Sequence, residues 1–256
     1  MQEIVIDNAA AKKYKRKVFI AFIIFIILIA SAVTAWRWLY YHQKDGGLFG
    51  GVQTPLRQVL NTNERLFSFT FNPDKKVKEY PKEYAVRHVK VNGDAGMSTD
   101  FFDPAKWKLQ VVKSNGDTLL VTLDEIKKLP KTDVVFNFKC IEGWSQITWW
   151  SGVRFVDFAE HYGLDKEAQM KYVGMKTPDE EYFVGIDMPS VMQPQTILCY
   201  EMNGKTLPMD QGYPLRLIIP VKYGVKHIKR IGTIFFDNNK PPDYWALRGY
   251  DYYTGH

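Results

Sequence analysis

The most informative part of the chain is the run Phe138-Lys139-Cys140-Ile141-Glu142-Gly143-Trp144-Ser145. A lone cysteine in it ends an apolar, strand-like segment at 134–138, and a glycine turn follows the cysteine. A thiolate at the end of a strand could act as a soft ligand to a metal. A buried free cysteine is more often an inert hydrophobic side chain, so the run indicates a metal site only together with other features.

A second informative run spans residues 211–229 and reads QGYPLRLIIPVKYGVKHIK. It starts with a turn, continues as an apolar strand that carries Arg216, and ends in a loop around Gly224. Five groups in or beside this loop could hold an anion, namely Lys222, Lys226, His227, Lys229 and Arg230. Cations interleaved with backbone amides suit a phosphate or pyrophosphate, which arginine can bind through two parallel hydrogen bonds. The alternative is a solvated basic hairpin without a ligand.

Length and composition narrow the class of protein. The 256 residues, 46% hydrophobic and 15% aromatic, suffice for one large packed domain or two small ones. The net charge of +6 does not indicate nucleic-acid binding, because five basic residues are gathered at 12–17, directly before an apolar span. The sequence has no glycine-rich phosphate loop, HExxH pair, nucleophile elbow, or haem or iron–sulfur ligation pattern. Its five histidines do not cluster at ligand spacing, so a zinc or non-haem iron site is not expected.

Residues 18–38 are predicted to form a transmembrane helix. No residue from Val18 to Trp36 is charged, and such a span is just long enough to cross a bilayer core of ~30 Å. Aromatic residues at 36–41 would lie at the interface, and the basic residues before the span place the tail 1–17 in the cytoplasm. The alternative is a cleaved signal peptide, since the small residues at 30–32 and 33–35 resemble cleavage sites.

Residues 39–80 are interpreted as a linker and N-terminal extension, and residues 81–256 as the main domain. The extension holds a glycine-rich stretch at 46–51 and a short helix at 54–60. The domain pattern is mostly strand-like, and it predicts a hairpin from 107–112 and 119–123, helices at 122–129 and 153–162, and strands at 134–138, 172–175, 182–186, 215–220 and 231–235. We therefore expect an α+β fold of mixed β-sheets with short, scattered helices.

The two cysteines, Cys140 and Cys199, leave one structural alternative open. An even number of cysteines in an oxidising compartment favours a disulfide. A bridge between them would describe a disulfide-stapled binding domain, whereas a metal site requires Cys140 to be a free thiol.

Taken together, the two runs resemble the molybdopterin-binding oxidoreductase domain of the sulfite oxidase superfamily. The similarity is to the bacterial branch that includes the catalytic subunit of periplasmic methionine sulfoxide reductase. It is carried by a Cys-x-Glu-Gly-Trp motif at 140–144, a Gly-x-Pro-x-Arg motif at 212–216 and a Lys-Tyr-Gly-x-Lys-x-Ile-Lys motif at 222–229. The run Pro241-Pro242-Asp243-Tyr244-Trp245 resembles the closing Pro-Pro-x-x-Trp of the same branch.

The resemblance implies a molybdenum–molybdopterin cofactor, with Cys140 as both metal ligand and catalytic residue. It also implies a set of cofactor-binding residues, namely Asn92, Thr177, Gln211, Arg216, His227, Ile228 and Lys229. There are two departures from the pattern. Gln211 replaces the usual asparagine or histidine, and the Asn-x-x-Tyr-Glu pattern of the methionine sulfoxide reductase is absent near Asn92. The second departure leaves the substrate open.

The activity implied by the resemblance is a two-electron oxygen-atom transfer, either sulfoxide reduction or sulfite-type oxidation, on a small or protein-bound substrate. Electrons would be exchanged with a haem-bearing membrane protein or a cytochrome. We expect residues 18–38 to anchor the chain in the bacterial inner membrane, with the catalytic domain in the periplasm. The alternative is a non-catalytic scaffold subunit of a membrane complex that keeps the fold.

Overall fold

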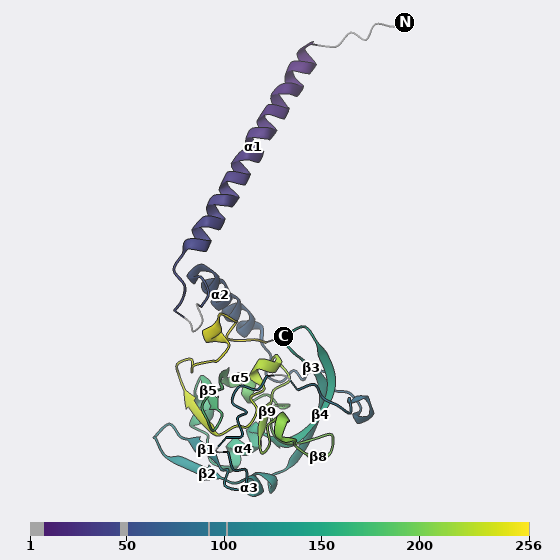
Figure 1. Ribbon diagram of the computed structural model, residues 1–256, viewed down its shortest axis with the longest axis vertical. Coiled ribbons are helices and arrows are strands. Elements are labelled where there is room, and N and C mark those ends of the chain that lie inside the picture. Colours follow the sequence, from purple (N-terminus) through teal and green to yellow (C-terminus); the bar gives the residue numbers. More distant parts are fainter. Residues whose placement is uncertain (1–7, 47–50, 92, 101, 256) are drawn as a thin grey trace.

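The N-terminal helix α1 (Asn8–Tyr41) projects away from the rest of the protein in the computed structural model, which describes residues 8–46, 51–91, 93–100 and 102–255 (Figure 1). Its stretch Ala11–Tyr41 is long and apolar enough to cross a membrane. A signal sequence near the N-terminus has the same properties. The helix extends past 18–38 at both ends. At the N-terminal end, the alanine, lysine and arginine residues before the apolar core are good helix formers.

The second helix, α2 (Thr54–Thr70), lies between α1 and the folded domain (Figure 1). Pro55 stands in its first turn, as the sequence indicates, but the helix continues well beyond the predicted 54–60. None of its residues is buried. The helix is therefore attached to the surface of the domain and is not part of the core.

Five strands form a mixed sheet in the order β2-β1-β10-β5-β6. Their bounds are β1 (Leu109–Val112), β2 (Thr118–Val121), β5 (Tyr172–Lys176), β6 (Phe183–Asp187) and β10 (Thr233–Asp237). The predicted hairpin is confirmed, since β1 and β2 pair in antiparallel fashion. β1 also pairs with β10 in parallel, although the two strands lie far apart in the sequence.

A second sheet has the order β3-β4-β7-β8, and β9 pairs with β7. Its strands are β3 (Lys131–Lys139), β4 (Ser145–Arg154), β7 (Ile197–Met202), β8 (Lys205–Thr206) and β9 (Arg216–Ile218). β3 is the strand predicted before Cys140, whereas β4 and β7 are absent from the prediction. In β4 the four residues 150–153 are all buried. With both faces of the strand covered, the alternation that identifies a half-exposed strand is lost.

Short helices connect the strands, which confirms the α+β prediction. They are α3 (Leu123–Lys127), α4 (Phe155–His161) and α5 (Met188–Val191), with 3₁₀ turns η2 (Lys82–Tyr84), η3 (Glu167–Gln169), η4 (Met209–Gln211), η5 (Gly224–Lys226) and η6 (Ala246–Arg248). Thr122 and Glu125 cap α3 reciprocally, as its sequence predicts. α4 begins later than the predicted residue 153, because 153 and 154 belong to β4.

The apolar core consists of two clusters, and the smaller one includes a cysteine. It lies on the second sheet and comprises Val134, Phe136, Phe138, Trp150, Ile197, Cys199, Leu207 and Ile218. Cys199 is fully buried in it, and both Cys140 and Cys199 are free thiols. The disulfide alternative is therefore wrong.

Two lysines of the basic run are buried in ion pairs instead of lying on the surface. Lys222 Nζ is 2.7 Å from Asp187 Oδ1, and Lys226 Nζ is 2.5 Å from Asp243 Oδ2. Both lysine side chains are only 1% exposed, and the Asp243 side chain is 3% exposed. The solvated-hairpin alternative for this run is therefore wrong. A buried pair of this kind matters mainly because either partner alone would be a buried charge without compensation.

We predict that Lys226→Met lowers the free energy of unfolding by about 3–5 kcal/mol, because it leaves the Asp243 carboxylate buried without its cation. Lys106→Met is the matched control, since Lys106 is 85% exposed in its pair with Asp103 and such pairs contribute at most ~1 kcal/mol. Chemical denaturation of the detergent-solubilised chain, followed by tryptophan fluorescence, measures both. Equal destabilisation of the two variants would contradict the prediction.

Candidate functional site

A small cavity of about 160 Å³ brings the cysteine of the first run together with the cations of the second. Cys140, Arg216, His227 and Lys229 line it, together with Gly93, Ala95, Ile141, Glu142, Tyr182, Gly224, Val225, Trp245 and Tyr250. The cavity lies where β3 ends, at the start of β9 and beside the 3₁₀ turn η5. Segments far apart in the sequence thus meet at one site.

A tight turn after β3 fixes the position of Cys140. Cys140 N donates to Trp144 O over 2.9 Å, and Gly143 N donates to Cys140 O over 3.1 Å. Gly143 has a φ of +88°, which favours glycine. The indole Nε1 of Trp144 donates to Glu142 Oε2 over 2.9 Å, which holds the turn's side chains. The hydrogen bonds of this turn therefore hold the Cys140 thiol at the wall of the cavity.

The Cys140 side chain is 3% exposed, and burial raises the pKa of its thiol. Without a metal the group is therefore a thiol at neutral pH. A bound metal ion reverses this preference, because a coordinating sulfur loses its proton.

Arg216 is a buried cation whose hydrogen-bond acceptors are all neutral. Its Nη1 donates to Gln211 O over 3.0 Å and to Gln211 Oε1 over 2.9 Å, and its Nη2 donates to His227 O over 3.3 Å. Its Nε is buried and has no hydrogen-bond partner among the described residues. Burial lowers the pKa of this guanidinium to about 10. An anion in the cavity would relieve both the uncompensated charge and the missing hydrogen bond.

Lys229 and His227 occupy the same cavity in different ways. Lys229 Nζ donates to Gly93 O over 2.9 Å, and burial, followed by the charge of Arg216, lowers its pKa to about 8. The His227 ring uses both nitrogens on the backbone, since Nδ1 accepts from Ile219 N over 3.4 Å and Nε2 lies 3.1 Å from Lys222 O. Lys229 is therefore suited to hold an anion, and His227 to hold the loop.

Three other predicted cofactor residues, Gln211, Ile228 and Thr177, lie outside the cavity lining. Gln211 is buried behind Arg216, and its Nε2 donates to Val89 O over 3.2 Å. Ile228 is buried in the larger core cluster. The Thr177 hydroxyl donates to Asp179 Oδ1 over 2.6 Å and accepts from Tyr182 N over 3.1 Å, so it organises a turn. Asn92 lies outside the described residues.

Three further cations of the basic run do not line the cavity, contrary to their interpretation as phosphate ligands. Lys222 and Lys226 are used in the buried ion pairs with aspartates. Arg230 Nη1 donates to Ser98 O over 2.6 Å, and its guanidinium lies 4.3 Å from the centre of the Phe102 ring. Of the five basic groups at 222–230, Lys229 and the His227 ring line the cavity together with Arg216.

An aromatic wall of the cavity is missing from the set of residues predicted by sequence. It consists of Tyr182, Trp245 and Tyr250. The rings of Trp245 and Tyr250 are 5.0 Å apart and nearly perpendicular, and Tyr182 OH donates to Val225 O over 2.6 Å. The only sequence signal for this wall is the Pro-Pro-x-x-Trp run that ends at Trp245.

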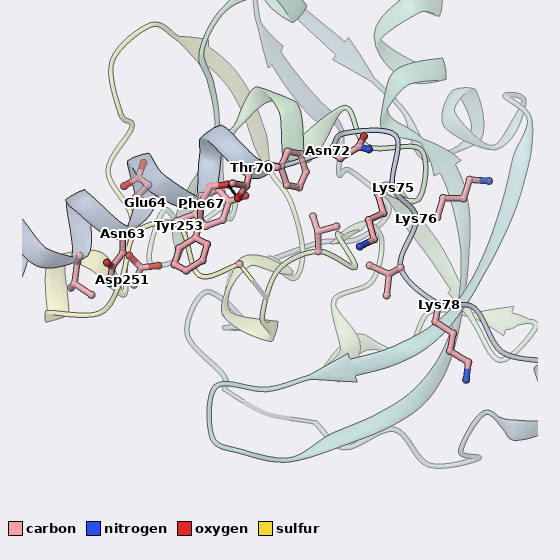
Figure 2. A pocket seen from close by; sticks show the side chains of 15 residues that line it. Asn63, Glu64, Phe67, Thr70, Asn72, Lys75, Lys76, Lys78, Asp251 and Tyr253 are labelled. Atoms are coloured by element: carbon pink, nitrogen blue, oxygen red, sulfur yellow. Dashed lines mark hydrogen bonds between the residues drawn. The ribbon is translucent and has the colours of Figure 1, made fainter.

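A larger cavity, about 770 Å³, lies between α2 and the C-terminal segment (Figure 2). Phe67, Lys75 and Tyr253 are among the residues around it (Figure 2). Neither cysteine lines it, nor does Arg216. The smaller cavity is the candidate site, because it alone of these two combines a thiol with a buried guanidinium.

Comparison with known proteins identifies the family of the chain. Residues 96–245 match a family model described as the oxidoreductase molybdopterin binding domain. The chain belongs to this family. The match shows both the class of activity, oxidoreductase, and the cofactor, a molybdenum-bearing molybdopterin.

Three relatives illustrate the range of the family. A protein from Azospira oryzae, named "Putative protein-methionine-sulfoxide reductase subunit YedZ1", is 36% identical over 205 residues, which is 80% of this chain and 77% of that protein. The catalytic subunit MsrP of protein-methionine-sulfoxide reductase from Campylobacter jejuni is 30% identical over 56% of this chain and 53% of its own length. Mitochondrial sulfite oxidase from Mus musculus is 28% identical over 58% of this chain and 32% of its own length. The chain thus spans about half or less of the latter two proteins.

The residues present fit the molybdopterin cofactor of the family. A metal–dithiolene group with a phosphate needs a soft ligand at one end and cations at the other. The cavity supplies the Cys140 thiol, the Arg216 guanidinium with its unpaired Nε, and Lys229. The described residues contain no group of three or more His, Cys, Asp or Glu side chains that could hold a metal ion without such a cofactor.

We predict that an anion binds the cofactor-free cavity more weakly as the pH rises through about 8. The pKa of Lys229 is about 8, so this lysine is mostly charged at pH 7 and mostly neutral at pH 9, which lowers the affinity by up to ~10-fold. Sulfate is a suitable probe because it does not titrate in this range. Thermal stabilisation of the cofactor-free chain by sulfate measures the effect.

Two variants separate this effect from the general stabilising action of sulfate. Lys229→Gln should remove the pH dependence, whereas Lys205→Gln, which changes an exposed residue of β8, should retain it. A pH dependence that persists in Lys229→Gln would exclude Lys229 as its source.

Proposed function

We propose that this chain is the membrane-anchored catalytic subunit of a sulfoxide reductase that receives electrons from a membrane partner. The observation that carries the proposal is the pairing, in one cavity, of the Cys140 thiol with the buried Arg216 guanidinium, whose Nε has no hydrogen-bond partner in the described part of the chain. This pairing matches the two ends of a molybdopterin, the metal and the phosphate.

Each residue has a separate role in this proposal. Cys140 binds the molybdenum, and Arg216 and Lys229 hold the phosphate. Gln211 and His227 orient Arg216, since both accept hydrogen bonds from its guanidinium. Ile228 and Thr177 fix the loops on either side through core packing and a turn. Asn92 precedes Gly93, which lines the cavity, and is assigned a cofactor contact by the resemblance alone.

The proposed reaction converts a sulfoxide, two electrons and two protons into a thioether and water. The cofactor, when bound, supplies the two-electron redox chemistry of the oxygen transfer. The protein excludes water from the buried thiol, fixes the cofactor's orientation and provides the cavity wall. The electrons must come from another protein, because the chain shows no haem or iron–sulfur ligation pattern.

Sulfoxides are favoured over sulfite by the composition of the cavity wall. Tyr182, Trp245 and Tyr250 offer apolar and aromatic surface, which suits a neutral sulfoxide and its thioether product. A sulfite dianion would require cations beyond those that the phosphate neutralises. The names of two bacterial relatives, both methionine sulfoxide reductase subunits, support the same choice.

The membrane part of the proposal is supported by α1 and by the charges that precede it. The helix is long and apolar enough to span a bilayer, and the basic residues at 12–17 favour a cytoplasmic N-terminus. The catalytic domain would then lie in the periplasm. A haem-bearing membrane protein or a cytochrome is the class of partner that could supply electrons there.

We predict that Cys140→Ser reduces viologen-driven reduction of methionine sulfoxide to background while the domain stays folded, because a serine hydroxyl is a harder and far less acidic ligand. Cys199→Ser is the matched control. Cys199 is fully buried in the core cluster of the second sheet and does not line the cavity, so its variant should keep its activity and metal. Molybdenum content by elemental mass spectrometry and activity are measured on the same preparations.

The outcomes separate the proposal from its alternatives. Stoichiometric molybdenum with sulfite but no sulfoxide turnover would leave the cofactor site correct and the substrate wrong. Wild-type protein without molybdenum, from cells whose other molybdenum enzymes are loaded, would favour the scaffold subunit.

A further inference from the structure

We propose that Arg57, on helix α2, is a positioning residue that fixes the cavity wall formed by Trp245 and Tyr250. The wall would then set which substrates reach the thiol end of the cavity. The link to substrate rests on the proposed function, whereas the link between Arg57 and the wall rests on contacts in the structure.

The Arg57 guanidinium connects the nearby Asp45 carboxylate with two backbone carbonyls of the C-terminal segment, 189 and 193 residues away in the sequence. Its Nη1 donates to Tyr250 O over 2.8 Å, its Nη2 donates to Ala246 O over 3.0 Å, and its Nε donates to Asp45 Oδ2 over 2.7 Å. The two carbonyls enclose the 3₁₀ turn η6 (Ala246–Arg248). One side chain of α2 therefore holds both ends of the turn that joins the two aromatic residues of the wall.

The turn is fixed from its other side by Asp243. The Oδ1 of Asp243 accepts from Trp245 N over 3.2 Å and from Ala246 N over 2.9 Å, while its Oδ2 forms the buried pair with Lys226. Asp243 thus anchors the start of the turn to the domain. Tyr250, which follows the turn, is 42% exposed, and its backbone carbonyl accepts the hydrogen bond from Arg57.

The segment that follows α1 holds Arg57 in place. Asp45 Oδ1 accepts from Val52 N over 3.0 Å, and Thr54 N donates to Gln43 O over 3.1 Å. The Arg57 and Asp45 side chains are 16% and 18% exposed, so their ion pair is partly shielded from water. The residues directly after the apolar helix are therefore joined by hydrogen bonds to the wall of the cofactor cavity.

Helix α2 does not serve to complete the apolar core, since none of its residues is buried. A further polar tie of the helix is the pair of Glu64 with Lys240, 2.5 Å apart, which again reaches the C-terminal part of the chain. Figure 2 shows Asn63, Glu64 and Phe67 of α2 beside Asp251 and Tyr253. The contacts of the helix are directed at the segment that follows β10, as a positioning role requires.

The test measures access to Cys140 in the full-length, cofactor-free chain in detergent, made in cells unable to synthesise molybdopterin. A maleimide reports how often the cavity opens, and mass spectrometry resolves labelling at each cysteine. Cys199 is fully buried in the core, so its labelling reports global unfolding in the same sample. We expect Arg57→Ala to raise the labelling rate of Cys140 by roughly 10-fold while that of Cys199 is unchanged.

Two further variants define the role of the guanidinium. Arg65→Ala is the matched control on the same helix, because Arg65 is exposed and its side chain makes no hydrogen bond with the described residues; we expect a change of less than about twofold. Arg57→Lys keeps the charge but not the fork that reaches both carbonyls, so it should not restore the wild-type rate. Labelling that rises equally at both cysteines, or at neither, would overturn the proposal.

Kinetics of the loaded enzyme test the effect on substrates. In Arg57→Ala, we expect KM for methionine sulfoxide to rise about 10-fold with a smaller change in kcat, and the preference between methionine sulfoxide and dimethyl sulfoxide to change. Unchanged KM and preference would exclude the wall as a determinant of specificity. If wild-type protein contains no molybdenum, the proposed function fails, but the labelling experiment still decides whether Arg57 fixes the wall.

Discussion

Four cations of the segment 216–230 are buried, namely Arg216, Lys222, Lys226 and Arg230. The hydrogen bonds and counter-charges that they require organise the domain. Desolvating an ammonium or guanidinium group costs on the order of several kcal/mol unless protein groups replace the lost water. Asp187 at the end of β6 satisfies Lys222, and Asp243 satisfies Lys226. Asp243 also accepts from Gly185 N, so this carboxylate joins the basic loop, the first sheet and the C-terminal segment. The walls of the cavity are a consequence of these pairs.

In the described part of the chain, Arg216 has no carboxylate among its hydrogen-bond acceptors, unlike Lys222 and Lys226. This difference creates the candidate site. Its acceptors are an amide and backbone carbonyls, which compensate hydrogen bonds but not charge. The charge therefore remains available in a cavity that also contains the Cys140 thiol. A structural ion pair at this position would stabilise the fold and exclude an anionic ligand. Neutral acceptors keep the guanidinium oriented while leaving its charge uncompensated for an anion in the cavity.

The sequence predicts those features that depend on neighbours in the chain. The strand before Cys140, the hairpin of β1 and β2 and the capped helix α3 are examples, and each depends on local turn, cap or alternation chemistry. The partners of the buried lysines cannot be predicted in this way, because Asp187 and Asp243 lie 35 and 17 residues from them. The basic loop therefore suggests a set of phosphate ligands, although most of its cations are structural. The family motifs include Arg216 and Lys229, which line the cavity, but they do not reveal the aromatic wall.

The role of residues 39–80 escapes sequence analysis for the same reason. Because α2 has no buried residue, its sequence has the pattern of a linker. Arg57 of α2 nevertheless donates hydrogen bonds to two backbone carbonyls of the C-terminal segment, which lie 189 and 193 residues away in the sequence. Such polar ties are individually weak, at about 1–3 kcal/mol for a charged donor, whereas unfolding the whole domain requires roughly 5–15 kcal/mol. The cavity wall can therefore open without loss of the fold. If α1 anchors the chain, as we propose, the segment proposed to control this opening directly follows the membrane helix in the sequence, on the side where the proposed electron-donating partner would dock.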